Sequence, residues 1–363
     1  MASSIVTTLL PIFIVYVLHE SVEKLGIVIA IATFVSYGLR ILFGYISDKY
    51  QIVKPFVVVG YLISALTEPF LMFSHTYGSV ALLRATERLG KAVRSASKDS
   101  LISSYAKQGK SGKTFGFHKM MDVSGELFGA LIIIAVFYYS AQNEMLIREL
   151  FGYTIIPGLL ATLILILFVK DAPKKLKEKK SVLNKEDYKL FPILAGYFLF
   201  LFFFISDQYF ILQAIDAGMT LVVIPLLVVA STLTQALTSY FSGTLIDKLG
   251  TKSMLFIAYI FGVLALILLK FHYFYIAFAL FGLFTVVSLN VLRAYISSEA
   301  KSKAFIYGIL YGGTAFFSAL GALSMGYIWK IFGVESMMNF SITGASVVAF
   351  GVLLQMLFTK TTH

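Results

Sequence analysis

The sequence predicts an all-α membrane protein, and three observations carry that prediction. Of the 363 residues, 58% are hydrophobic and 13% are charged, whereas soluble domains carry roughly 25% charged residues. About twelve apolar runs approach or exceed the length that crosses a bilayer as a helix. The polar residues gather in the joins between these runs. Because irregular backbone is not tolerated in lipid, the runs are expected to be helices.

The expected membrane-spanning helices follow one another with short joins, which favours antiparallel neighbours. Their approximate limits are 4–19, 26–46, 55–74, 77–97, 114–140, 149–169, 190–214, 219–242, 253–270, 273–294, 304–329 and 336–358. The first run lacks a basic leading region, so we interpret it as a span and not as a signal peptide. It is near the lower length limit, which indicates either a helix with little tilt or a true start upstream of Met1.

The longest polar join, KDAPKKLKEKKSVLNKEDYK, divides the spans about six and six. We predict an N-terminal six-helix bundle over residues 1–170, a basic linker over 171–188 and a C-terminal six-helix bundle over 189–363. Lys and Arg concentrate in one alternating set of loops, which includes this linker. The positive-inside rule makes that side cytoplasmic, so a multi-pass protein of the cytoplasmic (inner) cell membrane with both termini inside is expected. A solvated connector is favoured for the linker over a contact with anionic lipids.

Several function classes are disfavoured. The net charge of +11 is explained by basic inner loops and not by nucleic-acid binding. Cysteine is absent and no pair of histidines has metal-ligand spacing, so neither a disulfide nor a metal site is predicted. The stretch KQGKSGKT lacks the first glycine of a phosphate-binding loop. We therefore expect no enzyme activity and no cofactor.

The inner ends of the second and eighth spans repeat a pattern. GYISDKYQIVK begins at Gly44 and GTLIDKLGTK begins at Gly243. Each has glycine, three residues and then Asp-Lys in a short cytoplasmic loop. A weaker repeat pairs GKTFGF, from Gly112, with SKAFIYG, from Ser302. Matching marks in two halves predict a duplicated bundle.

This loop pattern resembles the signature of the major facilitator superfamily, Gly-x-x-x-Asp-Arg/Lys-x-Gly-x-Lys/Arg. The positions that match are Gly44, Asp48 and Lys49 in the first copy and Gly243, Asp247, Lys248, Gly250 and Lys252 in the second. Gln51 replaces the second glycine of the first copy. The resemblance implies two pseudo-symmetric six-helix bundles around a central cavity, secondary transport by alternating access, and an inner gate that uses the loop acids. The alternative is that these acids only terminate a helix and shape a turn.

The fourth span contains the charged stretch RATERLGKAVRSASKD, which begins at Arg84. On a helix its charged side chains fall within an arc of about 140°. A charged stripe of that kind is very costly against lipid, so it must face protein or a water-filled cavity. Asp122 and Glu126 recur on one face of the fifth span. We therefore predict ion pairs from Arg88 to Asp122 and from Arg84 to Glu126.

The same two stretches resemble one prokaryotic branch of the superfamily, which has Arg-x-x-Asp-Arg-x-Gly-Lys in the fourth span and Phe-Gly-Phe-His-Arg-x-Met-Asp in the fifth. A carboxylate that is paired in one state and solvated in another changes its proton affinity. The predicted transport network is Arg84, Glu87, Arg88, Asp122, Glu126 and Asp207, the last a lone acid in the seventh span. A static brace between helices is the alternative for the fourth and fifth spans. Glu68 and Arg293 are predicted to be structural.

The predicted function is secondary active transport of a small solute by a monomer, coupled to protons, with export by antiport ranked first. Uptake by proton symport, and uniport, are the alternatives. A membrane receptor or scaffold that transports nothing is the alternative from another class. The expected partners are a small-molecule substrate, protons and membrane lipids.

Overall fold

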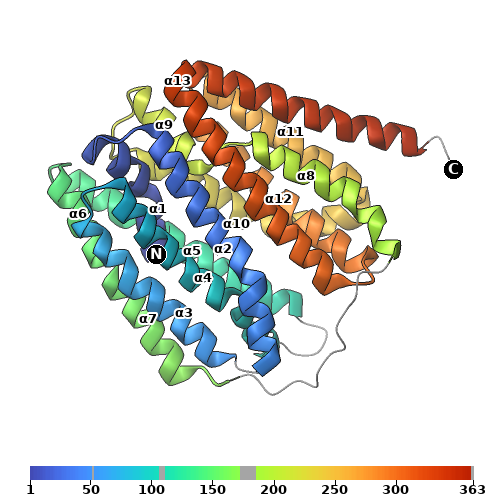
Figure 1. The fold of residues 1–363 in the computed structure, drawn as a ribbon, viewed down its shortest axis with the longest axis horizontal. Helices are drawn as coiled ribbons and strands as arrows, with labels where there is room; N and C mark the ends of the chain where they lie inside the picture. Colours follow the sequence, from blue (N-terminus) through green and yellow to red (C-terminus); the bar gives the residue numbers. More distant parts are fainter. Residues whose placement is uncertain (51–52, 106–110, 172–184, 361–363) are drawn as a thin grey trace. The chain divides into compact units, whose positions relative to one another are not determined.

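The computed structural model describes residues 1–50, 53–105, 111–171 and 185–360, and these ranges form helices and loops without strands (Figure 1). The predicted all-α fold is confirmed. The chain forms two compact units, Met1–Lys179 and Lys180–His363. Most of the expected linker lies outside the described residues.

Unit 1 contains seven α-helices and two short irregular helices in the described ranges. They are α1 (Ala2–Ile12), the π-helix η1 (Phe13–Val17), α2 (Val22–Tyr50), α3 (Lys54–Thr67), the 3-10 helix η2 (Glu68–Phe73), α4 (Tyr77–Tyr105), α5 (Ser111–Tyr139), α6 (Glu144–Tyr153) and α7 (Ile155–Phe168).

Unit 2 repeats this helical architecture in its described residues. Its elements are the 3-10 helix η3 (Lys185–Leu190), α8 (Phe191–Phe203), α9 (Asp207–Asp216), α10 (Ile224–Leu249), α11 (Thr251–Lys270), α12 (Phe274–Glu299) and α13 (Lys303–Lys360). The last two expected spans both fall in α13, whose chain turns at Gly333 with φ 83° and ψ 168°. Glycine adopts this left-handed φ without the steric cost that a Cβ would bring.

In the described part of the chain, eight helices are long and apolar enough to cross a membrane. The apolar helices Ala2–Val17 and Ile224–Ser239 are shorter. The charged stripe keeps α4 out of this group, although its 29 residues are long enough to span the bilayer at 1.5 Å per residue. Composition therefore accounts for the membrane fold, while the predicted number of twelve crossings stays a prediction.

The same helix pairings occur in both units. In unit 1, α4 packs against α2 and α3, and α3 also packs against α7 (Figure 1). In unit 2, α12 packs against α10 and α11, and α11 also packs against α13. These helices stand at corresponding places in the two halves, which supports the duplicated bundle that the loop motifs predict.

A glycine pair brings α3 and α4 close together. A Cβ added to Gly60 would lie 2.5 Å from the backbone oxygen of Gly90, and one added to Gly90 would lie 2.7 Å from the backbone oxygen of Gly60. Neither position has room for a side chain while the helices keep this separation. The approach places the polar face of α4 directly against α3.

Candidate functional site

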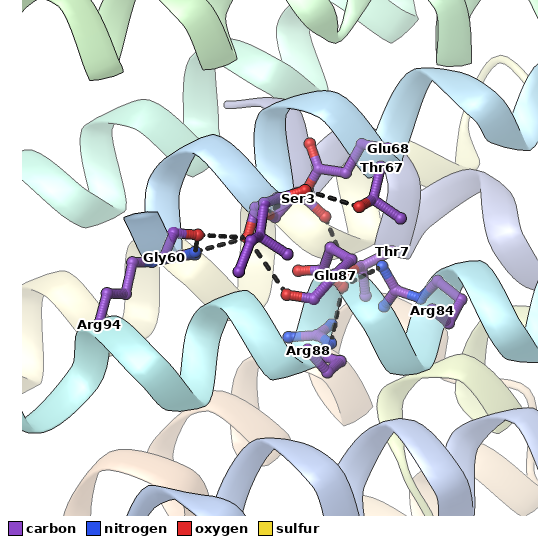
Figure 2. A network of polar contacts seen from close by, with 11 residues as sticks. Ser3, Thr7, Gly60, Thr67, Glu68, Arg84, Glu87, Arg88 and Arg94 are labelled. Carbon is purple, nitrogen blue, oxygen red and sulfur yellow. Dashed lines mark hydrogen bonds and ion pairs between the residues drawn. The ribbon is translucent and has the colours of Figure 1, made fainter. Parts of the chain in front are cut away.

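Three neighbouring charged residues of the α4 stripe have little contact with solvent. The side chains of Arg84 and Glu87 are each 1% exposed, and that of Arg88 is 15% exposed. Ionised groups withdrawn from water are strongly destabilising unless they are paired and hydrogen-bonded. The contacts around these three residues are therefore the candidate site (Figure 2).

Glu87 is the centre of the network. Its Oε2 accepts a hydrogen bond from Nη1 of Arg84 at 2.9 Å and lies 3.2 Å from Nε of Arg88. Its Oε1 is buried and has no hydrogen-bond partner in the described part of the chain. One carboxylate oxygen is thus shared by two guanidinium groups, while the other is left with its lone pairs unmatched.

Arg94, farther along the same stripe, fastens α4 to α3. Its Nη1 donates to the backbone oxygen of Gly60 at 2.9 Å and to Oγ of Ser64 at 2.5 Å, and its guanidinium lies 4.6 Å from the ring centre of Tyr61. Ser64 is also within 3.2 Å of the backbone oxygen of Glu87. Ser64 therefore links the guanidinium of Arg94 to the backbone of Glu87. These bonds make Arg94 a brace between two helices.

Glu68 is a second buried acid, which sequence reasoning placed outside the transport network. It is 2% exposed and accepts a hydrogen bond from Oγ of Ser3 at 2.7 Å. Its position follows from Pro69, which cannot continue the hydrogen bonding of an α-helix, so that α3 changes to the 3-10 helix η2 at Glu68. The charges of Glu87, Arg84 and Arg94 act on it. An acid inside the apolar run SALTEPFLMF was the signal that could have found it.

The two predicted ion pairs between the fourth and fifth spans are wrong. Arg84 and Arg88 both pair with Glu87 of their own helix. Asp122, whose side chain is 43% exposed, lies 3.6 Å from Nζ of Lys98 and 3.3 Å from Nε2 of His118. A link between α4 and α5 therefore exists, but it uses Lys98 in place of an arginine.

The physical reason for the different partners is packing. Glu87 lies one turn from Arg84 on the same face, so the pair forms without help from another helix. At the depth of Glu126, α5 packs against α1, where Oγ of Ser4 donates to the backbone oxygen of Glu126 at 3.0 Å. The carboxylate of Glu126 makes no ion pair with any residue that the structure describes.

Lys91 completes the stripe, one turn after Arg88. It is half-buried, and its Nζ makes no hydrogen bond or ion pair within the described ranges. The charges that act on it are those of Arg88, Glu87, Arg94 and Glu126. It is thus a cation inside the bundle whose nearest acid is already shared by two arginines.

The predicted inner-gate loops are described only in part. Gly44 is half-buried near the end of α2, but the side chains of Asp48, Lys49, Asp247 and Lys248, and the surroundings of Gly243, lie outside the described residues. The second loop is very tight, because α10 ends at Leu249 and α11 begins at Thr251. The residue between them, Gly250, has φ 77°, and the half-buried Lys252 follows it in α11.

One ion pair ties α2 to α4, and the sequence reasoning missed it. Nη2 of Arg40 lies 2.7 Å from Oδ2 of Asp99. The pair joins two helices that already pack along their length. Arg40 lies about one helical turn before Gly44, where the loop motif begins.

Asp207 stands at a break in the predicted seventh span. The helix α8 ends at Phe203, Phe204 and Ser206 are extended, with ψ of 118° and 160°, and α9 begins at Asp207. A carboxylate in the first turn of a helix is stabilised by the amide dipoles there. The structure therefore gives Asp207 a helix-starting role in unit 2.

Among the residues that the structure describes, no three His, Cys, Asp or Glu side chains gather at a common point.

The comparisons with known proteins agree with this picture. The family model of the Major Facilitator Superfamily matches residues 1–225. An MFS-type transporter of Methanocaldococcus jannaschii, MJ1317, is 30% identical over 352 residues, which cover 91% of this chain and 85% of that protein. The chain belongs to the major facilitator superfamily. The predicted family is thereby confirmed.

Solved structures show the same fold at low sequence identity. A mutant of the nucleoside transporter NupG superposes with a TM-score of 0.80 at 13% identity, covering 97% of this chain and 96% of its own. A D-xylose-proton symporter gives a TM-score of 0.68 at 16% identity, covering 96% and 93%. This chain is thus a multi-pass membrane transporter by its family, and it shares the fold of these solved structures.

Proposed function

We propose that this chain is a secondary active transporter that couples the movement of a small solute to protons, and that Glu87 is the group that carries the proton. One observation carries the proposal. A carboxylate that is 1% exposed is held by two arginines through a single oxygen, while its other oxygen has no hydrogen-bond partner in the described part of the chain. A proton could be added to that oxygen without a clash, because no described donor already points at it.

Protonation of Glu87 would change the energy of the whole network. The ionised carboxylate attracts Arg84 and Arg88, and neutralisation removes that attraction while both cations stay in a region where unpaired charge is costly. The two protonation states therefore favour different arrangements of α4. A transporter needs such a difference, because a bound proton shifts an equilibrium only as far as the two states differ in affinity for it.

The other acids take secondary roles in this proposal. Glu68 is a second buried carboxylate, on which the charges of Arg84 and Arg94 act. Glu126 stays a candidate because its charge acts on Lys91, and Asp207 stays the candidate of unit 2. Asp122 we assign to a brace, since it is well exposed and pairs with Lys98 and His118.

The test uses the purified full chain in liposomes that contain a mixture of metabolites, with and without an imposed pH gradient, and mass spectrometry as the readout. We expect at least one solute to move in a gradient-dependent way. Glu87→Gln should abolish the gradient-driven part while solute exchange at equal pH persists, because the gate still works without the proton. Glu335→Gln, which changes an acid that is 79% exposed, is the matched control.

The outcomes separate the roles. Gradient-driven transport that is unchanged in Glu87→Gln would make the network a static brace. If no solute moves with any protein, the receptor alternative is supported. The same assay with Asp207→Asn and Glu126→Gln ranks the remaining acids.

The direction of coupling is a separate prediction. Export by antiport is expected from the sequence, with proton symport and uniport as the alternatives. A solute that leaves the compartment into which protons flow indicates antiport, and one that enters with them indicates symport. Reporter fusions to each terminus test the proposed cytoplasmic location of both ends, which the basic loops support.

A further inference from the structure

The part of the α4 stripe from Arg84 to Arg94 carries more positive charge than the described acids around it can neutralise. Its four cations, Arg84, Arg88, Lys91 and Arg94, are faced by Glu87 on α4, Glu68 on η2 and Glu126 on α5. The amino group of Met1 is a further cation near Glu126 and Glu68, and Lys98, farther along the stripe, lies beside Asp122. One positive charge is left over when all three acids are ionised, and a second when one of them takes a proton. An excess of cation inside a bundle of apolar helices must be met by water or by an anion.

The excess is concentrated at two neighbouring residues. Arg84 donates through Nη1 to Glu87 and is closed off from solvent at 1% exposure, and Arg94 donates through Nη1 to the backbone of α3. Arg88, by contrast, reaches Glu87 through Nε, and its Nη1 and Nη2 donate to none of the residues that the structure describes. Lys91 likewise has an ammonium group that no described acid contacts.

These two side chains suit one kind of ligand. They are three residues apart and therefore lie on the same face of α4. The planar fork of an arginine binds two oxygens of a carboxylate or phosphate, and a lysine adds a compact positive charge. Both side chains are partly exposed to solvent. Arg88 is 15% exposed and Lys91 is half-buried, whereas Arg84 and Glu87 are almost fully buried.

We propose that the transported solute is an oxyanion, a carboxylate or a phosphate, whose charged group is bound by Arg88 and Lys91. The proposal rests on the transport function proposed above and names the substrate class. Glu87 competes with this anion for Arg88, so protonation of Glu87 releases the guanidinium for the solute. Proton and anion then bind cooperatively, and by linkage each raises the affinity for the other by the same factor. Cooperative loading of this kind favours symport over the antiport that the sequence analysis ranked first.

The experiment measures binding and needs no pH gradient. The purified full chain in detergent is titrated with sodium phosphate and with sodium benzoate, each against sodium chloride at equal ionic strength, and thermal unfolding reports binding through stabilisation of the folded state. We expect one or both oxyanions to stabilise the protein beyond the chloride control. The two titrations distinguish a phosphate site from a carboxylate site.

The variants locate the site. Lys91→Gln and Arg88→Gln should weaken the apparent affinity about tenfold or more, the effect of roughly one lost charge-assisted contact. Lys91→Arg should restore it, which excludes simple misfolding. Lys24→Gln is the matched control, because it also removes one lysine, but this lysine pairs with Glu20 at the start of α2. Glu87→Gln should bind the anion more tightly than the wild type.

Two results would overturn the proposal. One is that neither oxyanion stabilises the protein more than chloride does. The other is that Lys91→Gln and Lys24→Gln lose the same amount of oxyanion affinity. Neither result bears on proton coupling, which the gradient assay with Glu87→Gln measures separately. If transport is driven by protons through Glu87 but neither oxyanion binds, the substrate class is refuted and the proposed function stands.

Discussion

Gly60→Ala tests whether the close approach of α3 and α4 supports the charge network. An added Cβ would lie 2.5 Å from the backbone oxygen of Gly90 and 2.6 Å from Cβ of Arg94. Ordinary contact begins at 3.4 Å, so the helices would have to separate by about 0.9 Å, which is 3.4 minus 2.5. Backbone atoms cannot rotate away as a flexible side chain does, so the separation must be taken up by the helices themselves.

The expected cost follows from two opposing effects. Overpacking of this kind costs about 1–3 kcal/mol, while replacement of a helical glycine by alanine contributes about 0.5–1 kcal/mol in the opposite direction. The net destabilisation should be about 1–2 kcal/mol. The separation would also stretch the bonds from Arg94 to Gly60 and to Ser64, so gradient-driven transport should fall as well.

Denaturant unfolding followed by far-UV circular dichroism measures the change, and Gly38→Ala is the control. Gly38 lies on α2 in the same unit, and its added Cβ would meet only the ring of Phe34, at 3.8 Å. The free energy of unfolding of Gly38→Ala should therefore be unchanged or raised by up to about 1 kcal/mol. Equal stability of the two variants would refute the argument from helix separation.

Two further predictions concern other parts of the molecule. Asp187→Ala should destabilise the start of α13 by about 1 kcal/mol, because the buried Asp187 accepts hydrogen bonds from the backbone amides of Lys301 at 2.7 Å and Ser302 at 3.0 Å; hydrogen exchange of the first turn measures it. In the loop before α2, the hydrogen bond that Lys24 donates lowers the pKa of Glu20 from its ordinary 4.5. The pair therefore stabilises the fold above pH 4.5 and loses this contribution as the pH falls through the lowered pKa, a small change that thermal unfolding against pH detects.

Each of these predictions has a contrasting variant. Glu299→Gln removes an exposed partner of Lys189, at 2.7 Å, and should leave the start of α13 unchanged, because a surface pair contributes little. If it opens that turn as much as Asp187→Ala does, the capping argument fails. For the loop, Glu20→Gln should remove this part of the acid dependence, and an unaltered pH profile would contradict the assignment to Glu20.

The sequence by itself determined the class of protein and much of its layout. Its apolar composition and the lengths of its runs predicted an all-α membrane fold, since a backbone in lipid must satisfy its hydrogen bonds within helices. The repeated loop motifs at Gly44 and Gly243 identified the superfamily. The sequence also showed that the charged side chains of Arg84, Glu87 and Arg88 cannot face lipid. The free-energy cost of placing a charge in lipid is high whichever residue later pairs with it.

Only the tertiary structure decided which groups meet. The close contact of Gly60 with Gly90 brings Arg94 onto α3, and the change of helix type at Pro69 buries Glu68 against α1. The backbone oxygen of Glu126 accepts a hydrogen bond from Ser4, and the predicted partner of its carboxylate, Arg84, pairs with Glu87. Helical periodicity specifies the face on which a side chain lies, but ion pairs form over 3 to 4 Å. At that range the partner depends on which helix packs alongside and how closely, and those distances are set by the packing of residues far apart in the sequence.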